Sequence, residues 1–183
     1  SYVGMAHKRL SILDLSPTGH QPMETLDGRY IITFNGEIYN YPTLKNELKE
    51  KGYRFKSTTD TEVLLYAYAE WKSDCVTKLN GMFAFAIYDK DESVLFLARD
   101  RYGIKPLYYY HHNYTFLFGS EIKVFLKHPE FKTDVSVEAL NEYFSFQNIF
   151  SNKTLFEGVK TLEAGHTMKI SLADNQLSIK KYW

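Results

Sequence analysis

Two apolar stretches, MFAFAIY at residues 82–88 and SVLFLAR at residues 93–99, decide the fold class of this chain. Each has the length of a single strand, and a polar turn at residues 89–92 lies between them, which predicts a β-hairpin. Both faces of these two strands are largely apolar, so the sheet that contains them needs a covering layer on each side. The pattern therefore predicts an α+β fold, with packed antiparallel sheets and helices outside them.

Further strand signals lie on both sides of this hairpin. The stretch RYIITF at residues 29–34 follows an Asp27-Gly28 pair, which is a strong hairpin-turn signal. Residues 107–110 and 114–118 predict a second hairpin around the polar triplet HHN. Since the four strands of these two hairpins follow one another through short turns, we expect them to form an antiparallel sheet.

Helical patterns flank the predicted strands. Residues 43–51 place Leu44 and Leu48 four positions apart, which gives one apolar side to a short helix. The segment from Thr59 to Glu62 has the sequence of a capping box and predicts a helix over residues 62–71. Two more short helices are expected to begin at serine N-caps: Ser120 with a helix through residue 127, and Ser136 with a helix through residue 144.

The composition is that of an ordinary globular domain without an electrostatic preference. The 183 residues suit one domain, and 22 Lys+Arg balance 22 Asp+Glu. This balance gives no reason to expect nucleic acid or an anionic membrane as a partner. No apolar run approaches the roughly 20 residues that span a bilayer. The single cysteine, Cys75, allows no internal disulfide and favours a reducing, cytoplasmic compartment.

The segment FNGEIYN at residues 34–40 carries the most chemistry. It leaves a predicted strand, turns at Gly36, and supplies two amides and one carboxylate through Asn35, Asn40 and Glu37. A glycine lets the backbone approach a ligand closely, and an amide side chain beside an exposed N–H is what an oxyanion hole requires. The alternative is a strand-exit turn, in which Asn-Gly pairs are common. The motif alone does not decide between the two.

Two charged residues elsewhere complete the candidate site. Arg9 is able to hold a carboxylate through a bidentate pair, although an isolated arginine is more often a surface cation. Asp60 lies at the start of a predicted helix, where a negative charge also favours the helix itself. The adjacent His111 and His112 have poor geometry for a metal, so we expect no metal site. The charged stretch RDRYGIKPL at residues 99–107 predicts a loop without a direct catalytic role.

A series of motifs runs through nearly the whole chain: HKRLSILDLS with GHQPM, FNGEIYNY, STTDTEVLLYAY, LNGMFAFAIYD, LARDRYGIKPLYYY, FLFGSEIKVFLKHPEF and TLFEGVKTLEAGH. In this order they resemble the glutaminase domain of glutamine-hydrolysing asparagine synthases, which are class II glutamine amidotransferases. The resemblance implies a four-layer αββα sandwich of two packed antiparallel sheets, like that of the N-terminal-nucleophile hydrolases. This architecture agrees with the α+β fold that the strand patterns predict.

The resemblance also implies a role for each candidate residue. The side chain of Asn40 and the N–H of Gly36 would form the oxyanion hole. The implied substrate-binding residues are Arg9 for the α-carboxylate of glutamine, Glu37 and Asp60 for its α-ammonium group, and Asn35 with the backbone near Ile12 for the rest of the pocket. A zwitterionic amino acid needs opposite charges fixed on separate supports, so the chemistry of these residue types agrees with the implied roles.

In the family that the chain resembles, an amino-terminal cysteine attacks the glutamine amide and its own α-amine serves as the base. That cysteine would precede Arg9, so we expect residues 1–183 to be a partial amidotransferase domain without its nucleophile. Cys75 is expected to pack in the interior, and Ser1 is interpreted as a boundary. Residues 159–183 are expected to lead out towards a synthetase domain that would bind ATP and Mg. This domain itself has no phosphate-binding glycine loop, so we expect no cofactor in it.

The leading functional hypothesis is a glutaminase. It would hydrolyse glutamine to glutamate and ammonia and feed ATP-dependent asparagine synthesis from aspartate in a synthetase domain of the same protein. The alternative is a noncatalytic relative that binds glutamine or couples domains, inactive as supplied because the nucleophilic cysteine is absent. A third is a β-rich interaction module in which FNGEIYN is only a turn. Homodimer formation stays open, since a truncated sheet would expose an edge.

Overall fold

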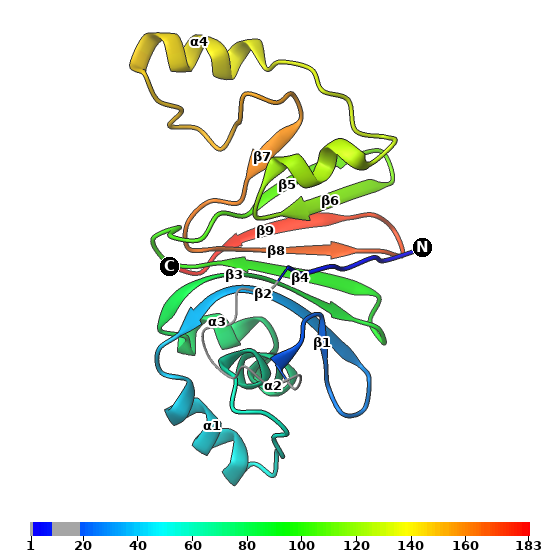
Figure 1. Ribbon diagram of the computed structural model, residues 1–183, viewed down its shortest axis with the longest axis vertical. Coiled ribbons are helices and arrows are strands. Elements are labelled where there is room, and N and C mark those ends of the chain that lie inside the picture. The colour runs from blue at the N-terminus through cyan, green and yellow to red at the C-terminus, as the bar shows by residue number, and fades with distance from the viewer. Residues whose placement is uncertain (1, 9–18) are drawn as a thin grey trace.

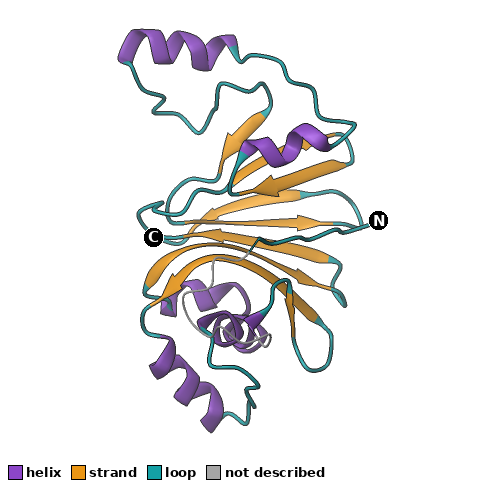
Figure 2. Ribbon diagram, in the orientation of Figure 1, coloured by secondary structure: helices purple, strands orange, loops and turns teal. Residues whose placement is uncertain are grey.

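Two antiparallel sheets lie one above the other in this protein, with helices on their outer sides (Figures 1 and 2). The computed structural model describes residues 2–8 and 19–183, so the predicted site residues Arg9 and Ile12 lie outside the described residues. The larger sheet has six strands in the order β1-β2-β3-β4-β8-β9, and the smaller has three in the order β6-β5-β7. The predicted α+β class with two packed antiparallel sheets is confirmed.

The larger sheet consists of β1 (Met23–Glu24), β2 (Tyr30–Ile38), β3 (Gly81–Asp89), β4 (Val94–Arg99), β8 (His166–Ser171) and β9 (Leu177–Lys181). The smaller sheet consists of β5 (Tyr108–His112), β6 (Thr115–Gly119) and β7 (Val159–Thr161). The α-helices are α1 (Tyr41–Glu50), α2 (Asp60–Trp71), α3 (Cys75–Lys78) and α4 (Val137–Phe146), and two short 3-10 helices are η2 (Lys72–Asp74) and η3 (Ile122–Lys127).

Strand β3 shows why the larger sheet is apolar on both faces. Phe83, Phe85 and Ile87 are buried in a cluster that includes residues of α1, α2 and α3. Ala84 and Ala86 alternate with them and are buried in a second cluster, which contains residues of both sheets. Successive side chains of a strand point to opposite faces, so a strand between two layers becomes a continuous apolar run. The MFAFAIY stretch is such a strand.

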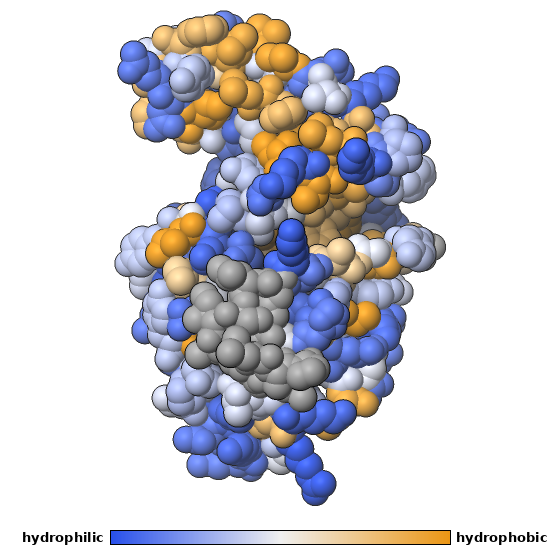
Figure 3. Space-filling model, in the orientation of Figure 1, coloured by the Kyte–Doolittle hydropathy of each residue, from blue (hydrophilic) through white to orange (hydrophobic). Residues whose placement is uncertain are grey.

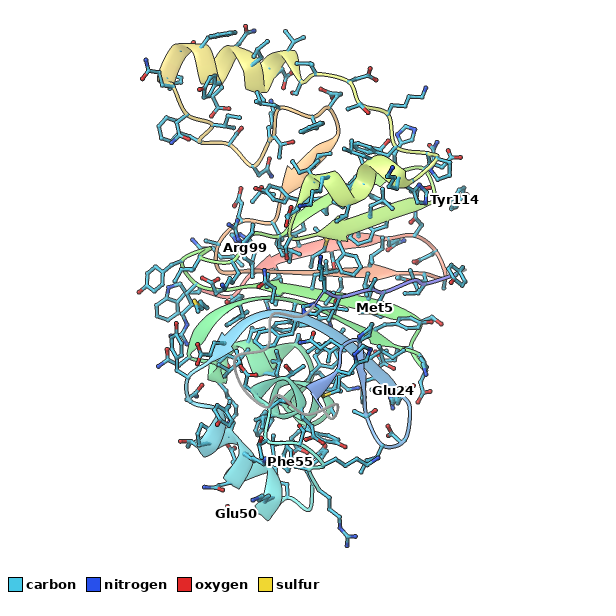
Figure 4. The ribbon with its side chains drawn as sticks, viewed as in Figure 1. Met5, Glu24, Glu50, Phe55, Arg99 and Tyr114 are labelled. Carbon is cyan, nitrogen blue, oxygen red and sulfur yellow. The ribbon has the colours of Figure 1, made fainter. Side chains whose placement is uncertain are left out.

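The turn at residues 99–107 carries the chain from the larger sheet to the smaller one. The buried Asp100 carboxylate accepts backbone N–H bonds from Phe83, Tyr102, Ile104 and Lys105. The Arg99 guanidinium, labelled in Figure 4, donates to the carbonyls of Gly103, Lys105 and Leu162. Strands β3 and β4 belong to the larger sheet, whereas β5 and β6 belong to the smaller one. The prediction that these four successive strands form one sheet is therefore wrong. Hairpin signals are local, and they do not specify which sheet each hairpin joins.

The predicted helices are present with small shifts of their ends. Helix α2 begins at Asp60, after the Thr59 side chain has accepted the N–H of Glu62, and Ser136 caps α4 in the same way. The prediction that Ser120 caps the next helix is wrong. The helix that follows it, η3, begins at Ile122 after Glu121, and no side chain caps it.

Residues 159–183, which the sequence predicts to lead out towards a synthetase domain, contribute strands to both sheets. They form β7 in the smaller sheet and β8 and β9 in the larger one. Strand β8 pairs with β4 through contacts such as Ala98 with Thr167, and β9 pairs with β8. The pairing of β4 with β8 joins residues far apart in the sequence, and the short apolar alternation of β8 gave too little local signal for it.

The outer side of the smaller sheet is covered by η3, whose Phe125 is buried with Tyr110 and Val159. Helix α4 lies further out and projects from the body (Figure 1), and Ala139 is its only buried residue. Apolar side chains gather over this region in Figure 3. Phe144 of α4 is 74% exposed. Within the described residues, the structure contains no helix of the length and apolarity needed to cross a membrane.

Candidate active site

A cleft of about 780 Å³ opens between the two sheets. Its walls come from β2, β3 and β6, from the start of α2, from η3 and from residues 4–8. Met5 marks this last segment in Figure 4, where it runs beside the larger sheet. Four residues of the predicted site line the cleft together: Asn35, Gly36, Glu37 and Asp60.

The outer edge of β2 presents a row of backbone N–H groups to this cleft. The N–H of Phe34 donates to the Gln21 side-chain oxygen at 2.6 Å, and that of Ile38 donates to Asp60 Oδ2 at 3.0 Å. In an antiparallel strand, alternate residues direct their N–H groups to the same edge. The Gly36 N–H lies between the N–H groups of Phe34 and Ile38 and therefore faces the same edge. It is flanked by the Gln21 and Asp60 side chains, which accept those two N–H groups.

Gly36 occupies its place because no side chain fits there. Its φ is +153°, and an added Cβ would lie 2.1 Å from the Met82 carbonyl oxygen and 2.8 Å from the Phe83 Cα. Gly81 on the opposite strand is equally tight, since its Cβ would lie 2.2 Å from the Glu37 carbonyl oxygen. The β2 and β3 backbones thus approach closely at the point where the cleft begins.

Asp60 is positioned by the first turn of α2 and by the loop before it. The Glu62 carboxylate accepts the N–H of Lys56 at 2.8 Å and of Ser57 at 2.7 Å, as well as the Ser57 hydroxyl. The Thr59 hydroxyl accepts the Glu62 N–H at 3.2 Å. These bonds fix the loop and the helix start to each other, so Asp60 has a defined place against the edge of β2.

The Asp60 carboxyl is an uncompensated acid in the described part of the chain. It is 6% exposed, and burial raises its pKa; the charge of Glu37 adds to that rise, whereas the N–H groups of Ile38 and Thr61 oppose it. The ion pairs of the described residues do not include Asp60 or Glu37. A buried carboxyl with the charge of Glu37 nearby favours a cationic group beside it.

The same cleft also contains amide and cationic side chains, which are candidate partners for the rest of a ligand whose cationic group lies beside the carboxyls. Asn35 donates its side-chain N–H to the Ser120 hydroxyl at 3.1 Å, which links β2 to the end of β6. Lys8, Lys105 and Lys127 also line the cleft. A single cavity therefore offers carboxylates, amide donors and cations, which suits a small zwitterion.

Comparison with known proteins identifies the family. The whole chain, residues 1–183, matches the family described as glutamine amidotransferase domain. The chain belongs to this family. The fold agrees, because the glutamine phosphoribosylpyrophosphate amidotransferase of Bacillus subtilis superposes with a TM-score of 0.61 at 19% identity, over 89% of this chain and 32% of that one.

The curated relatives of this glutamine amidotransferase domain are longer proteins. Asparagine synthetase [glutamine-hydrolyzing] 3 of Bacillus subtilis is 44% identical over 185 residues, which is 100% of this chain and 30% of that protein. Putative asparagine synthetase [glutamine-hydrolyzing] 2 of Methanocaldococcus jannaschii is 39% identical over 198 residues, covering 99% of this chain and 38% of that protein. The chain thus spans well under half of the length of either relative.

Asn40 lies apart from the other predicted site residues of the amidotransferase domain. Its side-chain nitrogen donates to the Lys78 carbonyl at 2.9 Å, and its side-chain oxygen accepts the Asn80 N–H at 2.9 Å. It does not belong to the cleft lining, which on this strand ends at Glu37. The structure therefore does not bring Asn40 together with Gly36 as the sequence predicts, because both ends of its amide hold the loop before β3.

Cys75, His111 and His112 are not among the residues that line the cleft of the amidotransferase domain. Cys75 is fully buried, and burial raises the pKa of its thiol, so it is a packing residue. His111 bonds to Asn175 at the far end of β5. Within residues 2–8 and 19–183, no group of three or more His, Cys, Asp or Glu side chains is arranged to hold a metal ion.

Sequence reasoning missed three residues of this site: Gln21, Gly81 and Ser120. Gln21 bridges Phe34 of β2 and Thr61 of α2. A glycine is required at position 81 because β2 and β3 approach closely there. Ser120 is part of the site because it contacts Asn35, which is 85 residues away in the sequence. No local pattern marks such residues, because each acts on a partner that only the fold brings near.

Proposed function

We propose that this domain binds glutamine in the cleft and hydrolyses its side-chain amide to glutamate and ammonia. The observation that carries the proposal is the pair of carboxyls, Asp60 and Glu37, placed beside the Gly36 N–H in one cleft. The carboxyls suit the α-ammonium group of an amino acid. The edge of β2 supplies a donor to the oxyanion that forms when a nucleophile adds to the amide carbon.

The side-chain donor of that oxyanion hole is better supplied by Asn35 than by Asn40. Asn35 lines the cleft next to Gly36, and its amide nitrogen carries a second hydrogen besides the one given to Ser120. The nitrogen of the tetrahedral intermediate takes up the proton that the nucleophile gives up, the C–N bond breaks and ammonia leaves. Water then hydrolyses the acyl bond to the nucleophile and releases glutamate. We assign none of the described residues as the nucleophile that attacks the amide carbon.

The names of the relatives support a proposal for the destination of the ammonia. Both relatives described above are named glutamine-hydrolysing asparagine synthetases, so we propose that ammonia passes to a synthetase domain that forms asparagine from aspartate with ATP and Mg. A cytoplasmic location fits the single buried thiol. Homodimer formation remains part of this proposal, to be checked by the molar mass in solution.

A second candidate is glutamine binding without hydrolysis by the 183-residue chain. It is favoured by one observation, which is that the single cysteine of the sequence is buried away from the cleft. Ligand binding and ammonia release separate the two functions. Binding with release supports the enzyme, whereas binding without release supports the second candidate for this chain.

The test compares Glu37→Gln with Glu47→Gln by titration calorimetry with glutamine. Glu47 is a surface residue of α1 that pairs with Lys78, so its change is a matched control with the same loss of charge. We expect Glu37→Gln to weaken glutamine binding by about tenfold or more, which corresponds to about 1.4 kcal/mol, and Glu47→Gln to leave it unchanged. Equal affinity in all three proteins, or no binding by the wild type, would contradict the proposed site.

A further inference from the structure

The Ser120 hydroxyl has a partner that its position in the sequence does not suggest. Ser120 lies between the last residue of β6 and the start of η3, where a serine commonly caps a helix. Here η3 has no side-chain cap, and the Ser120 oxygen instead accepts the Asn35 side-chain N–H at 3.1 Å. The bond crosses from the smaller sheet to the larger sheet at the wall of the cleft, since both residues line it.

This contact restricts a side chain that would otherwise have two orientations. The terminal torsion of an asparagine is broad and roughly two-fold, so its oxygen and nitrogen ends exchange easily when nothing distinguishes them. The bond that the Ser120 hydroxyl accepts from Asn35 holds the carboxamide at one torsion, with its nitrogen towards Ser120. One hydrogen of that nitrogen is then committed, and the other is held in a fixed direction relative to β2.

Ser120 is itself held by a tight turn. An added Cβ at the preceding Gly119 would lie 2.8 Å from Val124 Cγ2, so the backbone here packs directly against η3. Gly119 pairs with Tyr108 inside the smaller sheet, and Phe125 of η3 is 2% exposed. The hydroxyl therefore sits on a rigid support that does not belong to the strand carrying Asn35.

We propose that Ser120 is a positioning residue that orients the Asn35 carboxamide, so that its second N–H is available to the oxyanion formed during glutamine hydrolysis. The inference rests on the proposed function, in which Asn35 and the Gly36 N–H stabilise that oxyanion. Ser120 makes no contact with the reacting atoms. Its effect is to keep a donor aligned before the charge develops, which is the condition under which such a donor accelerates a reaction.

The test measures glutamine hydrolysis by the full-length gene product with Ser120→Ala, Ser120→Thr, Asn35→Ala and the Ser120→Ala/Asn35→Ala double variant. We expect Ser120→Ala to lower kcat by about tenfold while KM stays within about twofold, because a misaligned donor acts on the transition state more than on the ground state. Ser120→Thr keeps an accepting hydroxyl and is expected to restore most of kcat. Asn35→Ala is expected to lower kcat by about 100-fold or more.

The double variant distinguishes positioning from a merely structural role. If Ser120 acts through Asn35, Ser120→Ala has no further effect once Asn35 is alanine. A wild-type kcat in Ser120→Ala, an equal loss in Ser120→Thr, or a tenfold loss that persists in the double variant overturns the inference. Circular dichroism confirms that each variant is folded. A wild type that hydrolyses no glutamine overturns the proposed function and this inference with it, whereas the other outcomes concern Ser120 alone.

Discussion

At the scale of single residues, the Asp60 carboxyl combines a cost in stability with a role in binding. Its pKa is raised in the folded protein, chiefly by burial and then by the charge of Glu37. A group with a raised folded pKa loses a proton less readily in the folded state than in the unfolded one. Its charge therefore destabilises the fold as the pH rises from the ordinary aspartate pKa through the folded value.

Replacement of Asp60 by asparagine should separate these two effects. The amide oxygen still accepts the Ile38 N–H, so we expect Asp60→Asn to raise the free energy of unfolding at neutral pH, because the variant buries no charge at this position. The gain should vanish near pH 3, where aspartate is protonated in both states. Glutamine binding should weaken at the same time. Urea denaturation across this pH range, together with calorimetry, measures both, and a destabilised variant at neutral pH would show that the carboxylate is compensated.

The residue scale also shows where sequence reasoning loses its power. Asn35 and Asn40 belong to one motif, and their residue type gives no basis for choosing between them. Strand geometry does give one, because residues 35 and 37 share a face of β2, whereas Asn40 follows the end of that strand. The sequence was therefore sufficient to predict that Asn35, Gly36 and Glu37 lie together, but not to predict where Asn40 lies.

At the scale of the elements, the start of α2 supports the site. We expect Thr59→Ala to lower the free energy of unfolding by about 1 kcal/mol through the lost cap, and to weaken glutamine binding because Asp60 is the next residue. Ser136→Ala on α4 removes a similar cap and is the control. It should leave binding unchanged, since α4 lies away from the cleft lining. Chemical denaturation and calorimetry on both variants measure this, and equal effects on binding would refute the link.

The elements that were predicted correctly are those whose signals are local. The Thr59 and Ser136 caps and the two hairpins depend on residues within a few positions of one another. The sheet to which each hairpin belongs depends instead on burial over the whole molecule. The Asp100 and Arg99 side chains hold the turn between the two sheets. Their hydrogen-bond partners include Phe83 and Leu162, which are distant in sequence, so no spacing rule predicts them.

At the scale of the whole molecule, the layers differ in how much they bury. Helix α2 is buried from Asp60 through Tyr68, whereas α4 buries only Ala139. We expect amide hydrogens of α4 to exchange with solvent at least about 100-fold faster than those in the centre of α2, since local opening of α4 exposes little new surface. Hydrogen exchange followed by mass spectrometry or NMR measures this. Equal protection of the two helices would mean that the apolar face of α4 is covered in solution.

The close approach of β2 and β3 at Gly36 and Gly81 also limits how such a domain changes over evolutionary time. Neither position accepts a side chain while the opposite strand keeps its place, so the backbone that presents the Gly36 N–H is closed to substitution. Residues 35, 37 and 60 are not bound by that constraint. A lineage that acquires a new ligand for this cleft is therefore free to vary those side chains, and it inherits the main-chain donor unaltered.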